Sequence, residues 1–215
     1  KDYGLRWGAS LLRLNKEGKI KMDSSMKARI LTAAGADFRM GGGSCPIMTS
    51  GGSGNQGLGV ILPITVVGEE INAPNERVIR AIFFGHAINN FVKVYTGKLS
   101  SICGCAIAAG IGASAGITWL LGGDDEEIAG AVDNMLANLT GMLCDGAKES
   151  CACKLSTSAG EAVLSAYLAC EGTIVNPKIG ILGGTAEESI KNIGRLCREG
   201  FNTTDDALVN IMNQY

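Results

Sequence analysis

The sequence is poor in several features that mark common functional classes. Aromatic residues make up only 5% of its 215 residues, there is one histidine, and the formal net charge is −2. A chain without a basic surface has no electrostatic means of attracting nucleic acid, so we expect no nucleic-acid partner. A single histidine argues against a mixed Cys/His zinc site. The opening residues K-D-Y-G-L-R-W are charged and mixed, unlike a signal peptide.

The sequence also lacks an alternating apolar pattern long enough to require a β-sheet, and it has no internal repeat. Apolar residues recur at helical spacing instead, which predicts an all-α fold with one compact domain over residues 1–215. A buried strand is the alternative for residues 60–67. The predicted helices cover residues 1–15, 25–36, 55 onward with a bend near Pro63, 75–95, 99–121, 125–142, 158–170, 185–197 and 205–212.

Glycine and cysteine are abundant, with 31 and 8 residues respectively. Residues 99–121 form an uncharged run rich in glycine and alanine that is long enough to span a bilayer. Small residues suit a central helix that other helices cross closely, so we expect a buried helix and no membrane span. Cysteines within apolar helical patterns, without a leader, favour reduced thiols in the cytoplasm.

Three of the thiols lie close together within residues 144–154, which read C-D-G-A-K-E-S-C-A-C-K, and Cys103 and Cys105 lie upstream. Their spacing matches neither a zinc ribbon nor a ferredoxin. The neighbours of Cys144 and Cys151 are polar rather than core-filling, which favours a role in metal binding. Three thiolates with one open position suit an iron–sulfur cluster that binds substrate at its unique iron.

The other residues able to take part in chemistry each have a structural interpretation as well. Lys148 and Lys154 are candidates to orient a substrate carboxylate or to act as bases, or they are solvated loop lysines. His86, in the middle of a predicted helix, is a candidate base or a hydrogen-bonded core histidine. Cys170 and Cys197 occupy core-like helical positions and are expected to act as small apolar residues.

A glycine-rich loop at residues 50–57, S-G-G-S-G-N-Q-G, leads directly into a predicted helix. Backbone amides at such a helix start can bind an anion, and a carboxylate fits as well as a phosphate. No lysine of a P-loop follows, and no strand of Rossmann type precedes. A flexible connector is the alternative. The candidate substrate-binding residues are Ser50, Gly51, Gly52, Ser53, Gly54, Asn55 and Gln56.

Three segments together resemble the iron–sulfur serine dehydratase alpha-chain superfamily, and more closely its L-cysteine desulfidase branch. They are M-T-S-G-G-S-G-N-Q-G (48–57), Y-T-G-K-L-S-S-I-C-G-C-A-I-A-A-G-I-G-A-S-A-G (95–116) and G-M-L-C-D-G-A-K-E-S-C-A-C-K (141–154). They occur in the right order and cover the middle of the chain. The last long helix shows a weaker likeness.

The resemblance implies a [4Fe–4S] cluster held by three cysteines on an all-helical domain. By position these are Cys103, Cys144 and Cys151. Cys105 is the alternative to Cys103, and Cys153 has no counterpart. The implied reaction is β-elimination from a small amino acid, with iron acting as a Lewis acid. L-Cysteine would give pyruvate, ammonia and sulfide.

The resemblance also implies a missing part, because chains of this superfamily extend well beyond the amino end of this one. The chain is therefore expected to be the carboxy-terminal part of a longer chain, or one subunit that needs a partner, and a homo-oligomer is left open. Three alternatives remain to the L-cysteine reaction. They are an L-serine dehydratase of the same superfamily, a non-enzymatic iron–sulfur or metal-binding domain, and a membrane component built around residues 99–121.

Overall fold

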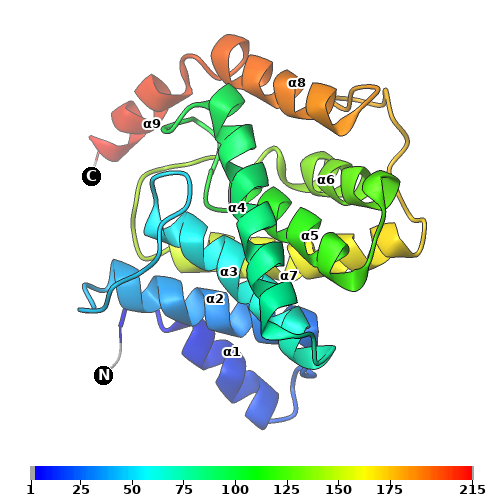
Figure 1. Ribbon diagram of the computed structural model, residues 1–215. Coiled ribbons are helices and arrows are strands. Elements are labelled where there is room, and N and C mark those ends of the chain that lie inside the picture. The colour runs from blue at the N-terminus through cyan, green and yellow to red at the C-terminus, as the bar shows by residue number, and fades with distance from the viewer. Residues whose placement is uncertain (1–2, 215) are drawn as a thin grey trace.

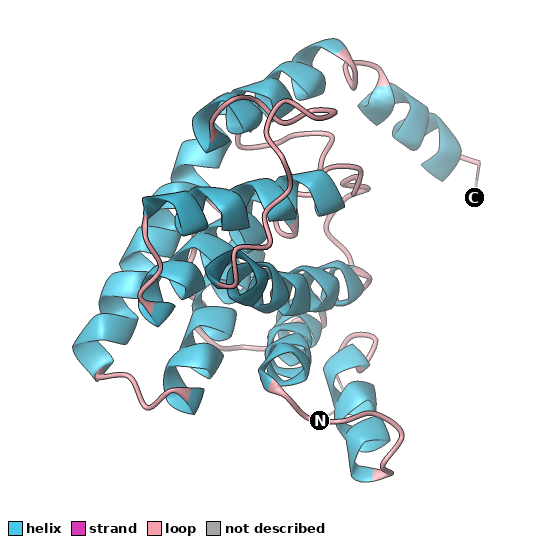
Figure 2. Ribbon diagram, turned by 90° about the vertical axis from the view of Figure 1, so that its right-hand side faces the viewer, coloured by secondary structure: helices cyan, strands magenta, loops and turns pink. Residues whose placement is uncertain are grey.

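The computed structural model describes residues 3–214, which form nine helices and no strand. Figure 2 shows helices joined by loops throughout this part of the chain. The all-α prediction is therefore confirmed. The helices are α1 (Trp7–Lys16), α2 (Ser24–Met40), α3 (Gly54–Glu70), α4 (Asn75–Thr96), α5 (Ile107–Leu121), α6 (Asp125–Leu139), α7 (Cys151–Cys170), α8 (Ala186–Glu199) and α9 (Thr204–Met212).

Helix α5 is the centre of the fold, as its glycine and alanine content predicts. Every residue from 107 to 118 is buried, and the helix packs against α3, α4, α6 and α7. Glycine permits this crowding: a Cβ atom at Gly85 of α4 would lie 2.8 Å from the carbonyl oxygen of Gly112 on α5. The backbones of α4 and α5 therefore meet directly where the two helices cross.

The other helices surround α5 in a recognisable order (Figure 1). Helix α4 runs across the front of the molecule, α1 and α2 lie at one end, and α8 and α9 lie at the other. Helix α8 packs on α4 and α6. Helix α9 has no buried residue and packs against none of the other helices of the described chain.

Several predicted helix boundaries are confirmed by their capping groups. The side chain of Asp23 accepts a hydrogen bond from the backbone N–H of Met26 at 2.7 Å and caps α2. At the start of α6, Asp124 and Glu127 form a capping box. The hydroxyl of Thr185 accepts from the N–H of Glu188 and caps α8.

The predicted helix through residues 60–67 is confirmed, since they lie inside α3 together with Pro63, and the strand alternative is excluded. Two local predictions are wrong. The central helix was predicted to start at Leu99, but residues 99–106 form a loop and α5 begins at Ile107. Helix α7 begins at Cys151 rather than at Ser158.

The early start of α7 has a packing reason. Ala152, Leu155 and Ala159 recur at helical spacing, and all three are buried. They lie on a helix that packs against α2 and α5. This apolar face extends into the cysteine-rich segment, so only residues 144–150 remain as a loop. The predicted start of the first helix, Lys1, lies outside the described residues. Within the described residues, α1 starts at Trp7.

Within residues 3–214, none of the helices combines the length and the apolar character needed to cross a bilayer. The central run that raised this alternative contributes only fifteen residues to α5.

Candidate functional site

Four thiols, the glycine loop and three lysines line one cavity of about 440 Å³. Its walls come from loops 51–53, 98–105 and 144–147 and from the ends of several helices. The lining residues are Arg39, Gly51, Gly52, Ser53, Asn55, Gln56, Lys93, Lys98, Leu99, Ser100, Ile102, Cys103, Gly104, Cys105, Cys144, Gly146, Ala147, Cys151, Lys154 and Asp205.

A short backbone pairing brings Cys103 and Cys144 to this cavity. Ile102 and Leu143 form an isolated antiparallel bridge between two loops. The N–H of Cys103 donates to the carbonyl of Met142, and the N–H of Cys144 donates to the carbonyl of Ser101, both at 2.8 Å. The bridge thus joins the segment before α5 to the segment before α7.

Cys151 reaches the same cavity from the first residue of α7, where its N–H donates to the carbonyl of Lys148 at 2.9 Å. Its side chain is 9% exposed, and that of Cys103 is 4% exposed. The predicted ligands Cys103, Cys144 and Cys151 therefore share one cavity, and so does the alternative, Cys105. Cys153 does not line it.

The side chains of Cys103 and Cys105 shift each other's pKa in opposite directions. Its neighbour Cys105 and burial raise the pKa of the Cys103 thiol far above its usual value. The Cys103 side chain lowers the pKa of Cys105, and a contact of 3.8 Å with the Ser53 hydroxyl lowers it further. Cys105 is therefore the more readily ionised thiol of the two.

The glycine loop makes a tight turn against the cavity. Ser50 and Ser53 exchange backbone hydrogen bonds of 3.1 and 3.0 Å, and Gly51 and Gly52 between them have φ values of +55° and +86°. The turn delivers the amino end of α3, with its free backbone N–H groups, to the cavity. Of the seven predicted loop residues, Ser50 and Gly54 do not line the cavity.

His86 supports this loop from behind and does not line the cavity. Its Nδ1 lies 2.7 Å from the hydroxyl oxygen of Ser50, which also accepts a hydrogen bond from Asn89 Nδ2 at 2.7 Å. The hydroxyl of Ser50 can therefore donate its own proton to Nδ1 of His86. Burial lowers the pKa of His86, which fits a neutral ring that accepts this proton.

The two predicted lysines share one carboxylate partner. Lys154 lines the cavity, makes an ion pair with Asp145, and donates to the carbonyl of Leu143 at 2.8 Å. Lys148 contacts the other oxygen of Asp145 at 2.5 Å and does not line the cavity. Burial alone would lower the pKa of Lys154, but Asp145 raises it, so Lys154 is held as a cation.

Sequence reasoning missed Lys93, the lysine of α4 that lines the cavity. Its side chain is only 7% exposed. A sequence signal was present: Asn89, Lys93 and Thr96 are polar residues spaced along one face of a helix, and all three are buried. Burial lowers the pKa of Lys93, and the surrounding cysteines oppose that shift.

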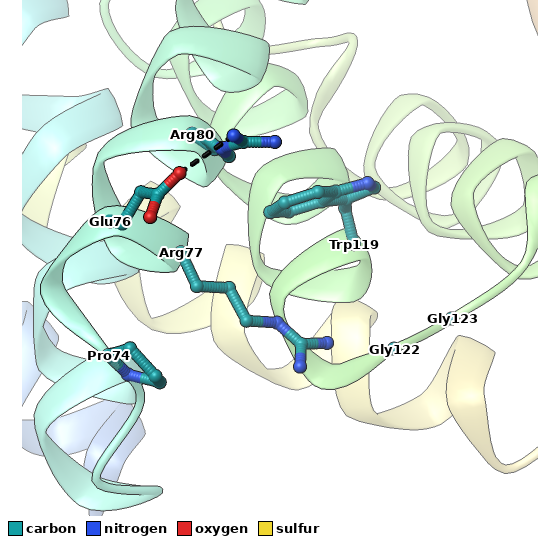
Figure 3. A pocket seen from close by; sticks show the side chains of 7 residues that line it. All are labelled: Pro74, Glu76, Arg77, Arg80, Trp119, Gly122 and Gly123. Atoms are coloured by element: carbon teal, nitrogen blue, oxygen red, sulfur yellow. Dashed lines mark hydrogen bonds and ion pairs between the residues drawn. The ribbon is translucent and has the colours of Figure 1, made fainter.

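A second hollow lies at the other end of α4 and contains no thiol (Figure 3). It has a volume of about 560 Å³ and is formed by the first turn of α4 and the end of α5. Arg77 lies over the ring of Trp119 at 5.9 Å, and Arg80 is ion-paired with Glu76 at 2.7 Å. These charged groups are exposed and already have partners.

Comparison with known proteins identifies the family of the chain. A family model described as serine dehydratase alpha chain matches residues 3–210. The chain belongs to the serine dehydratase alpha chain family. The superfamily expected from the three segments is thereby confirmed.

Curated relatives in this family are described as UPF0597 proteins, a description that specifies no reaction. One from Clostridium botulinum (strain Okra / Type B1) is 70% identical over 98% of this chain and 49% of its own length. Another from Desulforapulum autotrophicum is 46% identical over 97% of this chain and 47% of its own length. The chain thus spans about half the length of the curated relatives that it matches.

Family membership bears on the cofactor. Members of the serine dehydratase alpha chain family generally depend on iron–sulfur clusters. Within residues 3–214, no three ligand-type side chains gather closely enough to hold a single metal ion. A cluster needs a different arrangement, because each thiolate binds a different iron atom. Four thiols lining one cavity match the donor chemistry of such a cluster.

Proposed function

We propose that this chain is the cluster-bearing domain of a β-eliminating lyase that converts L-cysteine to pyruvate, ammonia and sulfide. The observation that carries the proposal is the cavity in which Cys103, Cys144 and Cys151 meet the glycine loop. We propose these three cysteines as ligands of a [4Fe–4S] cluster, with Cys105 as the alternative to Cys103. When bound, such a cluster supplies a Lewis-acidic iron next to the substrate.

The reaction balances without a further oxidant or reductant. The α-proton of L-cysteine is removed, the Cβ–S bond breaks, and its electron pair leaves with sulfur. The remaining enamine tautomerises, and water then releases ammonia and pyruvate. The name of the family favours L-serine as a second candidate substrate, with water instead of sulfide as the leaving group.

The protein groups divide into those that bind and those that position. The amino end of α3 presents backbone N–H groups toward an anionic substrate. His86 and Asn89 hold the Ser50 end of the glycine loop in place. Lys154 contributes positive charge to the cavity, but its ion pair with Asp145 opposes a role as the base. All eight cysteines are free thiols, which suits a reducing compartment such as the cytoplasm.

We further propose that the chain works with an additional region or a partner subunit, as the carboxy-terminal part of a longer protein. The support is its coverage of about half of its relatives and an exposed apolar face on α4. Ile79, Phe83 and Val94 on this face are 65%, 75% and 75% exposed. Leu99, at the cavity, is 96% exposed. A partner that covers Leu99 would also lie over the cavity.

This interface is testable with the Clostridium botulinum relative. The half of that relative that this chain does not cover would be co-expressed with the chain. We expect the two to co-purify, and Phe83→Glu to abolish co-purification. Leu164→Glu is the matched control, since Leu164 is 46% exposed on α7. Co-purification that survives Phe83→Glu would contradict the proposed face.

The lyase proposal is tested by anaerobic reconstitution with iron and sulfide, followed by an iron count, a visible spectrum and an assay of sulfide released from L-cysteine. We expect close to four irons per chain and release of sulfide and pyruvate in equal amounts. Pyruvate from L-serine at a higher kcat/KM would favour the dehydratase. A reconstituted cluster without turnover of either amino acid, in this chain and in the reconstituted complex, would contradict the enzymatic proposal.

A further inference from the structure

Lys93 is a buried cation without a partner. It lies on α4, lines the thiol cavity, and is 7% exposed. Its ammonium makes no hydrogen bond or ion pair within the described part of the chain, whereas Lys154 in the same cavity has Asp145. Most of this side chain is buried and its ammonium borders the cavity without a counter-charge, so an anion bound in the cavity would be favoured there.

Gln56 is the second group with unused hydrogen-bonding capacity in this wall. It lies in the first turn of α3, is 3% exposed, and its Oε1 has no hydrogen-bond partner. No hydrogen bond within the described residues therefore satisfies this oxygen, and the amide lines the cavity. The Nε2 atom of Gln56 can donate to an oxygen atom in the cavity.

Gly104 shows that the two side chains border the same small space. A Cβ atom at Gly104 would lie 3.0 Å from Lys93 Nζ and 3.3 Å from Gln56 Nε2. Both nitrogen donors therefore approach the same side of Gly104, where an alanine methyl group would press against them, and one carboxylate in the cavity can reach both. Gly104 lies between Cys103 and Cys105, so this space is also next to the thiols.

We propose that Lys93 and Gln56 bind the carboxylate of the amino-acid substrate in the space above Gly104. This inference rests on the proposed function, since it assigns a place to the substrate of that reaction. A carboxylate offers two oxygens, one for the ammonium of Lys93 and one for the amide of Gln56. An α-amino acid held there by its carboxylate would have its β-carbon near the thiols on either side of Gly104.

Two other sources of negative charge in the cavity are alternative partners for Lys93. Asp205 also lines the cavity, but it belongs to α9, which packs against no other described helix, and it makes no ion pair with Lys93. The thiolates of Cys103 and Cys105 are the other candidates, in which case Lys93 would only neutralise the metal ligands. That alternative predicts loss of iron when Lys93 is replaced, whereas a carboxylate site predicts loss of substrate binding.

The test uses L-alanine, which has the carboxylate but no leaving group, and L-alaninamide, which lacks the carboxylate charge. Binding of both is measured by calorimetry to the reconstituted chain and to the cluster-free chain. The variants are Lys93→Met, Lys93→Arg and Gly104→Ala. Lys16→Met, an exposed lysine of α1, is the matched control.

We expect the Kd for L-alanine to rise at least about tenfold in Lys93→Met, with the parent iron content retained. Gly104→Ala should weaken binding similarly because its methyl group fills the space. Lys93→Arg should recover part of the affinity, and Lys16→Met should match the parent. The parent should bind L-alaninamide at least about tenfold more weakly than L-alanine.

Three results would overturn the inference. They are unchanged L-alanine affinity in Lys93→Met, equal affinity of the parent for L-alanine and L-alaninamide, and a parent that binds neither. Loss of iron with unchanged L-alanine binding would assign Lys93 to the thiolates instead. Failure of the lyase proposal is separate: L-alanine binding that depends on Lys93, without sulfide release, would leave the carboxylate site standing. Sulfide release with an unchanged KM in Lys93→Met would remove only that site.

Discussion

The two hollows beside α4 hold positive charge in opposite ways. At the amino end of the helix, Arg80 is paired with Glu76 on the surface, and Arg77 lies over Trp119. At the carboxyl end, Lys93 is buried and unpaired in a cavity with four thiols. The unpaired, buried groups of the thiol cavity make it the better candidate for a ligand site, because a ligand can provide the hydrogen bonds and counter-charge that the protein does not.

The largest effect is expected at the thiols. Cys144→Ser and Cys151→Ser should each reduce the iron retained after anaerobic reconstitution to near zero, because three ligands leave none to spare. Iron and acid-labile sulfide per chain are the measurements. Cys170→Ser is the matched control, since it lies at the opposite end of the same helix as Cys151. Equal iron in Cys144→Ser and the parent would remove Cys144 from the ligand set.

The same comparison shows what a single sequence can predict. Helical spacing predicted the central helix and the existence of α2, α4 and α8, because that signal is local. The bridge between Ile102 and Leu143 was not foreseen, because it joins segments about forty residues apart that have no local pattern. It nevertheless sets the positions of two predicted ligands. Non-local backbone pairing thus determines the site more than the cysteine spacing does.

Composition misled the sequence reasoning at two other positions. The start of α7 looked like part of a polar loop because it follows the polar residues 145–150, while Ala152 and Leu155 already form its buried face. Lys93 was passed over because a lysine in a helix usually faces solvent. In both cases packing by neighbouring helices overrides the local character of the residue.

Replacement of Lys93 should give the next largest effect, and in an unusual direction. Lys93→Met should raise the free energy of unfolding of the cluster-free chain by about 2 kcal/mol, because an unpaired buried ammonium is replaced by an apolar chain of similar length. Urea denaturation followed by circular dichroism measures this. Lys16→Met, on the surface, should leave the free energy unchanged. A loss of stability in Lys93→Met would mean that the ammonium has a favourable partner in solution.

Lys148 and Lys154, which are ion-paired with Asp145, should stabilise the folded chain. Burial alone would raise the pKa of Asp145, but Lys148 and Lys154 lower it from 3.8 to about 2. The carboxylate therefore contributes stability above its unfolded pKa, and this contribution is lost as the pH falls from about 4 through 2.

Asp145→Asn should lower the free energy of unfolding at neutral pH by about 1 kcal/mol, a value reduced for the 38% exposure of the side chain. Denaturation at a series of pH values should show a shallower loss between about pH 4 and 2 in this variant than in the parent. Asp206→Asn, at an exposed position of α9, is the control. An unchanged pH profile in Asp145→Asn would mean that the two ion pairs do not persist in solution.

The smallest effect is expected at the hollow beside Trp119. Glu76→Gln removes the ion pair with Arg80, whose side chains are 77% and 68% exposed. The free energy of unfolding should fall by no more than about 0.5 kcal/mol, because water already solvates both charges, and the difference should vanish in high salt. Iron retention and L-alanine binding should match the parent. A change in iron retention or in L-alanine binding would mean that the hollow beside Trp119 is coupled to the thiol cavity through α4. Paired and unpaired charge would then no longer distinguish the two sites.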